Sequence, residues 1–136
     1  MHEWALADGV VTTAHKVARQ EKIKKISRLR IKVGEVQQID MEIFRNALEQ
    51  IIQSHDDLLQ GAAIEIDIAE AVLKCRNCGH MWTFQQAMKQ LSHDESEAIH
   101  FVPEMAHVYI GCPECCSPDF EVAQGRGVWL DAIVGE

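Results

Sequence analysis

No uninterrupted apolar stretch in this sequence approaches the roughly 18 to 20 residues that a membrane-spanning helix needs. A secretory signal peptide would place Lys or Arg among the first residues, where this sequence has Glu3 and Asp8 instead. Low-complexity tracts and internal repeats are missing as well. We therefore expect a cytoplasmic protein without a membrane partner.

A general excess of positive charge is also missing, because the net charge is -8. Residues 35–136 hold five Lys and Arg against eighteen Asp and Glu, a net -13, so most of the surface would repel phosphate and we expect no nucleic-acid partner. Residues 1–34 hold eight basic residues against three acidic ones, a net +5. The basic run from Lys22 to Lys32 could meet an acidic partner, although a solvated strand face is the commoner explanation.

The sequence shows no arrangement typical of a catalytic nucleophile, a phosphate loop or a general-base pair, so we do not expect an enzyme. Its 47% hydrophobic and 25% charged content exclude a mostly disordered chain. With 136 residues, the chain suffices for one ordinary domain, or for one small core with a metal-stabilised appendage.

Hydrophobic periodicity predicts a small α+β fold. Apolar residues recur at three- and four-residue intervals from His2 to about Gln20, which predicts an amphipathic helix with Trp4 anchoring its start. A second helix is predicted from an N-cap at Asp40 to about Ser54. Alternating apolar and polar residues predict three strands, at 27–33, 64–68 and 128–134. We expect the two helices to cover one face of the three-stranded sheet.

A segment of different character lies between the second and third predicted strands. It holds all five cysteines and four of the seven histidines, and we interpret it as an inserted domain. Its ends must come back together, because the last strand rejoins the sheet. The predicted domains are residues 1–70 plus 128–136, and the insert 71–127. Within the insert, a short helix is predicted from Phe84 to Leu91.

Two CxxC pairs dominate this insert, Cys75 with Cys78 and Cys112 with Cys115. Four thiolates in a tetrahedral arrangement are the ligands of structural Zn²⁺, and so small an insert needs such a staple. Two disulfides or a redox-active pair are the alternatives. A cytosolic location disfavours the first, and the doubling of the motif disfavours the second. We therefore predict structural zinc.

The fifth cysteine and the spacing of the pairs are irregular. Cys116 could replace Cys115 as a ligand, remain a free thiol or be buried as an apolar residue, and we expect burial. The 33 residues from Gly79 to Gly111 exceed the roughly 15 to 20 of the usual spacing between such pairs.

The amino terminus is a second candidate metal site. The free amine of Met1 and the amide and imidazole nitrogens of His2 can reach one ion through small chelate rings, and this nitrogen array suits Ni²⁺ or Cu²⁺ better than Zn²⁺. Glu3 could complete the site or balance its charge. A frayed terminus is the commoner reason for a histidine at this position. Among the other histidines, His100 is our candidate for an extra ligand, because apolar neighbours would hold it, although loop histidines usually have no such role.

Together these features resemble the nickel metallochaperones of NiFe hydrogenase maturation, the HypA/HybF family. The resemblance spans essentially the whole chain. It rests on Met1-His2-Glu3-Trp4-Ala5-Leu6-Ala7, Gly34-Glu35-Val36, the two CxxC pairs and Gly125-Arg126-Gly127-Val128-Trp129-Leu130.

The resemblance implies a nickel-binding α/β domain that uses Met1, His2 and Glu3, and an inserted zinc domain. The implied zinc ligands are Cys75, Cys78, Cys112 and Cys115. It also implies that Ni(II) is the transported ion, that Zn(II) is structural, that the hydrogenase large-subunit precursor receives the nickel, and that a maturation GTPase is the working partner.

Two features depart from the usual family pattern. Cys116 stands where the family usually has glycine, and the long excursion between the CxxC pairs is similar to that of archaeal members, which supports His100 as an extra nickel ligand. The main alternative function is a nucleic-acid-binding or adaptor zinc-ribbon protein. The net charge of residues 35–136 disfavours nucleic-acid binding.

Overall fold

The computed structural model describes residues 2–37, 39–55 and 57–136, and it divides into two compact units. Unit 1 comprises Met1–Lys32, Ile39–Asp67 and Val128–Glu136, and unit 2 comprises Val33–Gln38 and Ile68–Gly127. The segment Val33–Gln38 therefore groups with unit 2.

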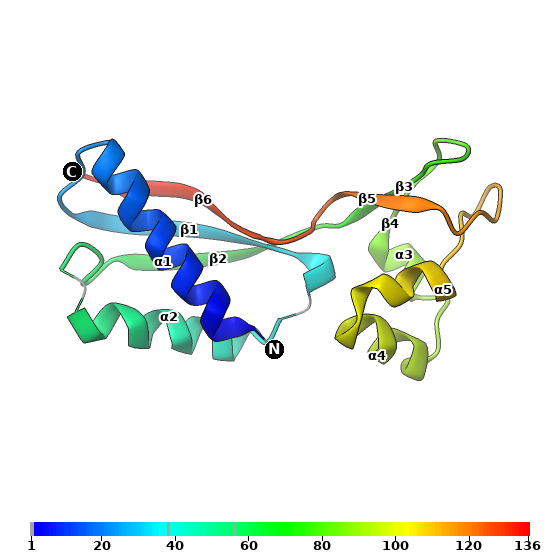
Figure 1. The fold of residues 1–136 in the computed structure, drawn as a ribbon, viewed down its shortest axis with the longest axis horizontal. Helices are drawn as coiled ribbons and strands as arrows, with labels where there is room; N and C mark the ends of the chain where they lie inside the picture. The colour runs from blue at the N-terminus through cyan, green and yellow to red at the C-terminus, as the bar shows by residue number, and fades with distance from the viewer. Residues whose placement is uncertain (1, 38, 56) are drawn as a thin grey trace. The chain divides into compact units, whose positions relative to one another are not determined.

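Unit 1 contains two helices and a three-stranded sheet. The helices are α1 (Glu3–Gln20) and α2 (Met41–His55), and the sheet has the order β2-β1-β6, formed by β1 (Ile26–Gly34), β2 (Ala63–Ala69) and β6 (Val128–Gly135). Figure 1 shows α1 and α2 beside this sheet. The mixed helix and strand architecture confirms the predicted α+β class.

Strand β1 explains why the sheet has one covered face. Leu29 and Ile31 are fully buried, whereas the intervening Arg28 and Arg30 side chains are about half exposed. Both arginines lie within 3.3 Å of the carboxylate of Glu65 on β2, which identifies the opposite face of the sheet as polar. The alternation in the sequence thus corresponds to one core face and one charged face.

Helix α1 buries the predicted apolar stripe, with one exchange at its start. Ala7, Val10, Val11 and Ala14 are buried as expected. The prediction that Trp4 anchors the helix is wrong, since this side chain is 54% exposed. Its neighbour Glu3 is buried instead, with only 6% of its surface exposed, because a hydrogen bond from the amide of Asp40, the residue before α2, compensates its burial.

Helix α2 begins where the sequence predicts. The Asp40 carboxylate accepts a hydrogen bond from the backbone amide of Ile43 at 3.1 Å, so Asp40 is the N-cap. The apolar face of α2 buries Phe44, Ala47 and Leu48 in the core of unit 1.

Unit 2 is built on a second three-stranded sheet that the sequence did not reveal. The order is β4-β3-β5, with β3 (Val72–Cys75), β4 (Met81–Thr83) and β5 (Phe120–Gln124) all antiparallel to their neighbours. Leu73 pairs with Trp82 on one side and with Val122 on the other. Strands of three to five residues are too short for a clear period-2 signal.

The long excursion between the CxxC pairs is helical. It contains α3 (Phe84–Met88), α4 (His93–Phe101) and α5 (Ala106–Tyr109), with a 3-10 turn before α5 (Pro103–Met105). Helix α3 ends before the predicted Leu91. Capping boxes start the first two helices, formed by Thr83 with Gln86 and by Ser92 with Glu95. Their apolar residues complete a core with the second sheet, and its large buried members are Leu73, Trp82, Phe84, Ile99 and Phe120.

The two glycine-containing motifs of the sequence meet inside unit 2. Gly34 donates its amide to the carbonyl oxygen of Gly127 at 2.7 Å, and a Cβ atom on Gly34 would clash with the backbone of Gly125. The Glu35 carboxylate accepts a hydrogen bond from the Ala71 amide at 2.8 Å. A second 3-10 turn, Glu35–Gln37, follows β1 at this point. These motifs therefore allow the backbones of three chain segments, near Gly34, Ala71 and Gly125, to pack in direct contact.

Candidate metal centres

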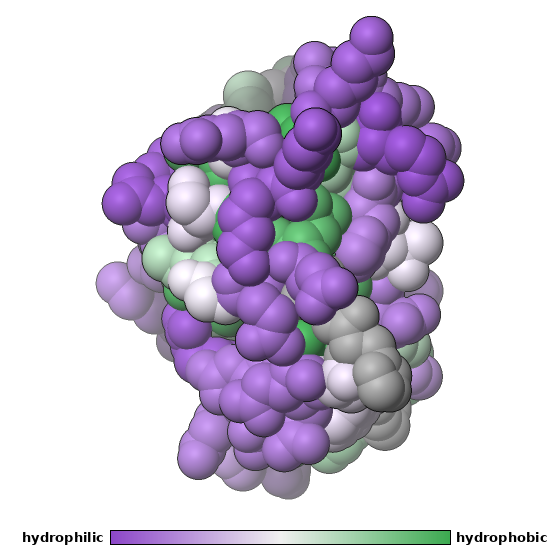
Figure 2. Space-filling model, turned by 90° about the vertical axis from the view of Figure 1, so that its left-hand side faces the viewer, coloured by the Kyte–Doolittle hydropathy of each residue, from purple (hydrophilic) through white to green (hydrophobic). Residues whose placement is uncertain are grey.

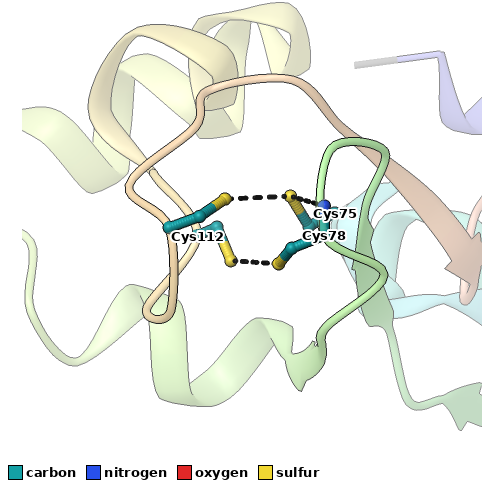
Figure 3. A group of neighbouring side chains, drawn as sticks. Cys75, Cys78 and Cys112 are labelled. Atoms are coloured by element: carbon teal, nitrogen blue, oxygen red, sulfur yellow. Dashed lines mark hydrogen bonds between the residues drawn. The ribbon is translucent and has the colours of Figure 1, made fainter.

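The four cysteines of the two CxxC pairs form one cluster. Their Sγ atoms all lie within 4.8 Å of one another, and two contacts across the pairs, Cys75 to Cys115 and Cys78 to Cys112, measure 3.5 Å each. Figure 3 shows the Cys75, Cys78 and Cys112 side chains pointing toward one another from two facing turns. All five cysteines are free thiols, so the disulfide alternative fails.

The cluster fits tetrahedral zinc. A Zn–S distance of about 2.3 Å places the sulfurs of a regular tetrahedron about 3.8 Å apart, close to the spacing found here. Cys75 and Cys112 are buried, whereas Cys78 and Cys115 are exposed. Bound zinc would supply a divalent positive charge that holds the sulfurs as thiolates and joins the two turns. The four side chains are compatible with a structural site that leaves no position open for a substrate.

Each cysteine pair sits on a turn of the same construction. In the first, the Gly79 amide donates to the Cys75 carbonyl at 3.0 Å, and the Cys75 amide donates to the His80 carbonyl at 2.8 Å. In the second, the Cys116 amide donates to the Cys112 carbonyl at 2.8 Å. Amides within both turns also point at the sulfur of the first cysteine, at 3.4 Å from Cys78 N to Cys75 Sγ and from Glu114 N to Cys112 Sγ. Such amide-to-sulfur bonds stabilise thiolates.

The surroundings of Cys78 and Cys115 shift the pKa values of their thiols in opposite directions. The side-chain amide of Asn77, 3.5 Å from the Cys115 sulfur, lowers the pKa of Cys115 to about 6, assisted by the Ser117 backbone. A backbone hydrogen bond from His80 favours the Cys78 thiolate, but burial and the three neighbouring sulfurs outweigh it and raise the pKa of Cys78 to about 12. Four adjacent thiols cannot all ionise without a cation.

The burial prediction for Cys116 is wrong. Its side chain is exposed, and its sulfur is not part of the four-cysteine cluster. Its φ of 64° is in the left-handed region, so the residue occupies the turn position that Gly79 fills, at φ 81°, in the first pair. The turn geometry directs Cys115 inward and Cys116 outward. Sequence adjacency alone could not decide between them.

The amino-terminal candidate site lies at the start of α1. Met1 lies outside the described residues. His2 is the N-cap residue of α1, with an exposed side chain that makes no capping bond. Its carbonyl accepts the Leu6 amide at 2.9 Å, while its own amide is not required by the helix. The imidazole and the amide nitrogen of His2 are therefore not committed to the helical hydrogen-bond ladder.

Glu3 is fixed more firmly than the sequence suggested. Its Oε1 accepts the Asp40 backbone amide at 3.1 Å, at the first turn of α2. A hydrogen bond from the amino-terminal ammonium group, assisted by this Asp40 bond, overcomes the cost of burial and lowers the pKa of Glu3 to about 2. The carboxylate thus joins the start of α1 to the start of α2. Asp40 was predicted only as a cap, and its second role required the tertiary structure.

The histidines of unit 2 are dispersed. His100 lies in α4, but its side chain is outside the described part of the chain, so its candidacy is untested. His80 stacks on Trp82 with ring centroids 6.0 Å apart. His107 stacks on Phe120 at 4.4 Å, and its Nδ1 lies 3.1 Å from the Pro118 carbonyl, so Nδ1 carries the proton.

Fold and cluster together define an α+β protein with a structural metal site, and comparison with known proteins identifies the family. A sequence model described as "Hydrogenase/urease nickel incorporation, metallochaperone, hypA" matches residues 1–134. A relative named "Hydrogenase maturation factor HypA" from Thermococcus onnurineus is 43% identical over 133 residues, 98% of this chain and 94% of its own. A relative of the same name from Pyrococcus furiosus is 40% identical over 136 residues, which are 100% of this chain and 96% of that relative.

The chain therefore belongs to the HypA family of nickel incorporation metallochaperones, which act in hydrogenase maturation. The fold agrees with the solution structure of the Ni metallochaperone HypA from Helicobacter pylori, with a TM-score of 0.66 at 20% sequence identity, covering 99% of this chain and 97% of that one. Membership confirms the predicted resemblance. No helix in the described ranges combines the length and apolar character needed to traverse a bilayer.

Proposed function

We propose that the chain binds Ni(II) at its amino terminus and delivers it to the hydrogenase large-subunit precursor, with a maturation GTPase as its partner, in the cytoplasm. The nickel ligands are the Met1 amine and the amide and imidazole nitrogens of His2, with Glu3 and His100 as further candidates. The observation that carries the proposal is the exposed, uncapped His2 at the start of a helix, in a chain whose family match begins at residue 1.

Glu3 has a defined part in this proposal. Its carboxylate is held by the Asp40 amide, so the negative charge stays at the helix start whether or not an ion is present. A negative charge there offsets the charge of Ni²⁺. The His2 amide must lose its proton to bind, which makes nickel binding dependent on pH. A site at a chain end exchanges its ion more readily than a buried cage, as a carrier requires.

The four cysteines serve a different purpose in the same proposal. Cys75, Cys78, Cys112 and Cys115 hold zinc permanently and stabilise unit 2 by joining its two cysteine turns. The zinc ion is therefore resident, and the nickel ion is cargo. The alternative function, a nucleic-acid-binding or adaptor zinc ribbon, gains no support from the family match.

Nickel titration of the untagged, zinc-loaded chain tests the proposal. His2→Ala and a chain extended by one glycine before Met1 should each lower nickel affinity at least about tenfold, since each removes ligands from the chelate. His100→Ala should lower it further only if His100 is a ligand. His93→Ala is the matched control, because His93 is an exposed histidine of the same helix. Unchanged affinity in both terminal variants would refute the terminal site, while zinc content should be constant throughout.

A further inference from the structure

The end of α1 that lies opposite the proposed nickel site carries a cluster of positive charge. We define the basic surface as Lys16, Arg19, Lys22, Lys24 and Lys25, all of them exposed. Within residues 16–25 only Glu21 is acidic. Figure 2, which faces this end of unit 1, shows a surface formed mostly by hydrophilic side chains. This local excess contrasts with the net charge of -8 of the whole chain.

Most of these cations are not used by the fold. Lys25 Nζ donates to the Asp57 carbonyl oxygen at 3.0 Å. The side chains of Lys16, Arg19, Lys22 and Lys24 make no hydrogen bond or ion pair with any residue in the described ranges. By comparison, Arg28 and Arg30 further along the chain both pair with Glu65. The acidic residue Glu136 lies beside this surface, because its main-chain oxygen accepts the amides of Lys24 and Lys25 at 2.7 and 3.1 Å. The four side chains that have no partner among the described residues still give the basic surface capacity for an external anion.

The backbone at Lys22 supplies an independent observation. Helix α1 ends in a Schellman motif, in which the Ile23 amide donates to the Ala18 carbonyl at 2.8 Å and the Lys22 amide lies 3.4 Å from the Arg19 carbonyl. Lys22 occupies the left-handed position of this motif, at φ 59°. Glycine is the residue that this position favours, and a lysine there is strained. A lysine kept at this strained position, among other lysines without partners in the described part of the chain, indicates that the positive charge of Lys22 has a role outside the fold.

Simple stabilisation of the helix is a weaker explanation. Cations near a helix C-terminus interact favourably with its dipole, and Arg19 in the last turn already provides this. A lysine at the left-handed position gains little from the dipole and costs strain that glycine would avoid. The dipole account also predicts the opposite response to Lys22→Gly, namely a loss of stability.

We propose that the basic surface is a docking site for an acidic segment of a partner protein. Charge complementarity supports this occupant, because unpaired cations attract and orient a carboxylate-rich surface. Nucleic acid is disfavoured, since residues 16–25 contain no aromatic side chain on which bases could stack and the rest of the chain is acidic. Helix α1 spans about 27 Å, from 18 residues at about 1.5 Å each, so a partner held here leaves the helix start accessible.

The experiment uses the full-length zinc-loaded chain and a poly-L-glutamate peptide as probe, with amide chemical shifts mapping the contact. We expect shifts confined to residues 16–25 and affinity that falls with salt. Lys22→Glu with Lys24→Glu should weaken binding about tenfold. The control pair is Lys74→Glu with Lys89→Glu, two exposed lysines of unit 2 whose reversal gives the same change in net charge, from -8 to -12, and should weaken binding less than about twofold.

Lys22→Gly separates docking from folding. It should raise the melting temperature by about 2 to 4 °C, because it relieves the left-handed strain, while weakening peptide binding about two- to threefold. A lower melting temperature, equal effects of the two reversed pairs, or shifts outside residues 16–25 would each overturn the proposal. So would tighter binding of a DNA duplex of equal charge, or self-association of the chain that the Lys22 and Lys24 reversals abolish. None of these readouts involves nickel.

Discussion

Gly79 and Cys116 occupy equivalent positions in the two cysteine turns, although only one of them is a glycine. Each donates its backbone amide to the carbonyl of the cysteine four residues earlier, at 3.0 Å and 2.8 Å, and each has a left-handed φ, at 81° and 64°. The turn requires this conformation, and a side chain makes it costly. Unit 2 therefore carries strain in one of its two turns.

Replacing Cys116 with glycine should stabilise the protein by about 1 kcal/mol, because it removes the penalty of a left-handed side chain. Urea denaturation of the zinc-loaded chain measures the change. Gly79→Ala is the reciprocal test and should destabilise by about 1 kcal/mol, since an added Cβ meets no atom within 4 Å and only the backbone penalty remains. Destabilisation by Cys116→Gly would show that the Cys116 side chain has a structural role.

Loss of one zinc ligand should unfold unit 2 while unit 1 keeps its core. Cys75→Ser leaves three sulfur ligands and places a serine hydroxyl at the buried position of the fourth. Because metal binding and folding are coupled in small zinc units, we expect the amide protons of β3, β4 and β5 to lose their protection from exchange. Hydrogen exchange resolves the two units separately. Cys116→Ser is the control and should retain both zinc and protection.

Zinc affinity should fall more steeply below about pH 6 than above it. The pKa of Cys115 is lowered to about 6, so above that pH Cys115 binds the metal without releasing a proton, and below it one additional proton competes. Competition titrations with a chelator between pH 5 and 8 give the slope. Asn77→Ala removes the hydrogen bond that lowers this pKa and should move the break to higher pH. If the slope of zinc affinity against pH changes at the same pH in Asn77→Ala as in the unaltered chain, a group other than Cys115 causes that change.

Glu3 should contribute to stability only where it is ionised. Its pKa is about 2 in the folded protein and near 4.5 in the unfolded chain, so the contribution is complete above about pH 4.5 and is lost as pH falls toward 2. Glu3→Gln should cost about 1.5 to 3 kcal/mol at pH 7, the range for hydrogen bonds to charged groups. Urea denaturation at pH 7 and pH 3 should show this difference shrinking on acidification.

The control for that experiment is Asp8→Asn, an exposed carboxylate on the same helix. It should change stability by less than about 0.5 kcal/mol at either pH. A Glu3→Gln effect that is equal at both pH values would mean that shape, rather than charge, holds Glu3 at its site.

Local sequence patterns predicted the parts of this fold that local physics determines. Three predictions rest on residues that are close together in the sequence: the helix periodicity of α1, the alternation in β1 and the Asp40 cap. The structure confirms each of them. The cysteine cluster was predicted for the same reason, because two residues of each pair already share a turn. The Ser92 capping box could have revealed α4, since its signal is equally local.

Two of the features that the sequence did not reveal depend on distant contacts, and a third depends on the backbone geometry of one turn. Glu3 is buried because a backbone amide 37 residues away, that of Asp40, donates a hydrogen bond to its carboxylate, while Trp4 beside it remains exposed. Cys116 is exposed because the turn at Cys112 closes on a left-handed residue, which adjacency to Cys115 could not show. The second sheet pairs Cys75 with Phe120, far along the chain. Tertiary partners determined the burial of Glu3 and the pairing of the second sheet, whereas a local turn determined the exposure of Cys116.

X-ray absorption at the nickel edge, recorded on the zinc-loaded, untagged chain with one equivalent of Ni²⁺, tests the central claim most directly. The account predicts a first shell of nitrogen and oxygen with an imidazole signature that His2→Ala removes, while zinc retains four sulfur ligands. A nickel shell that contains sulfur, or one that His2→Ala leaves unaltered, would contradict it.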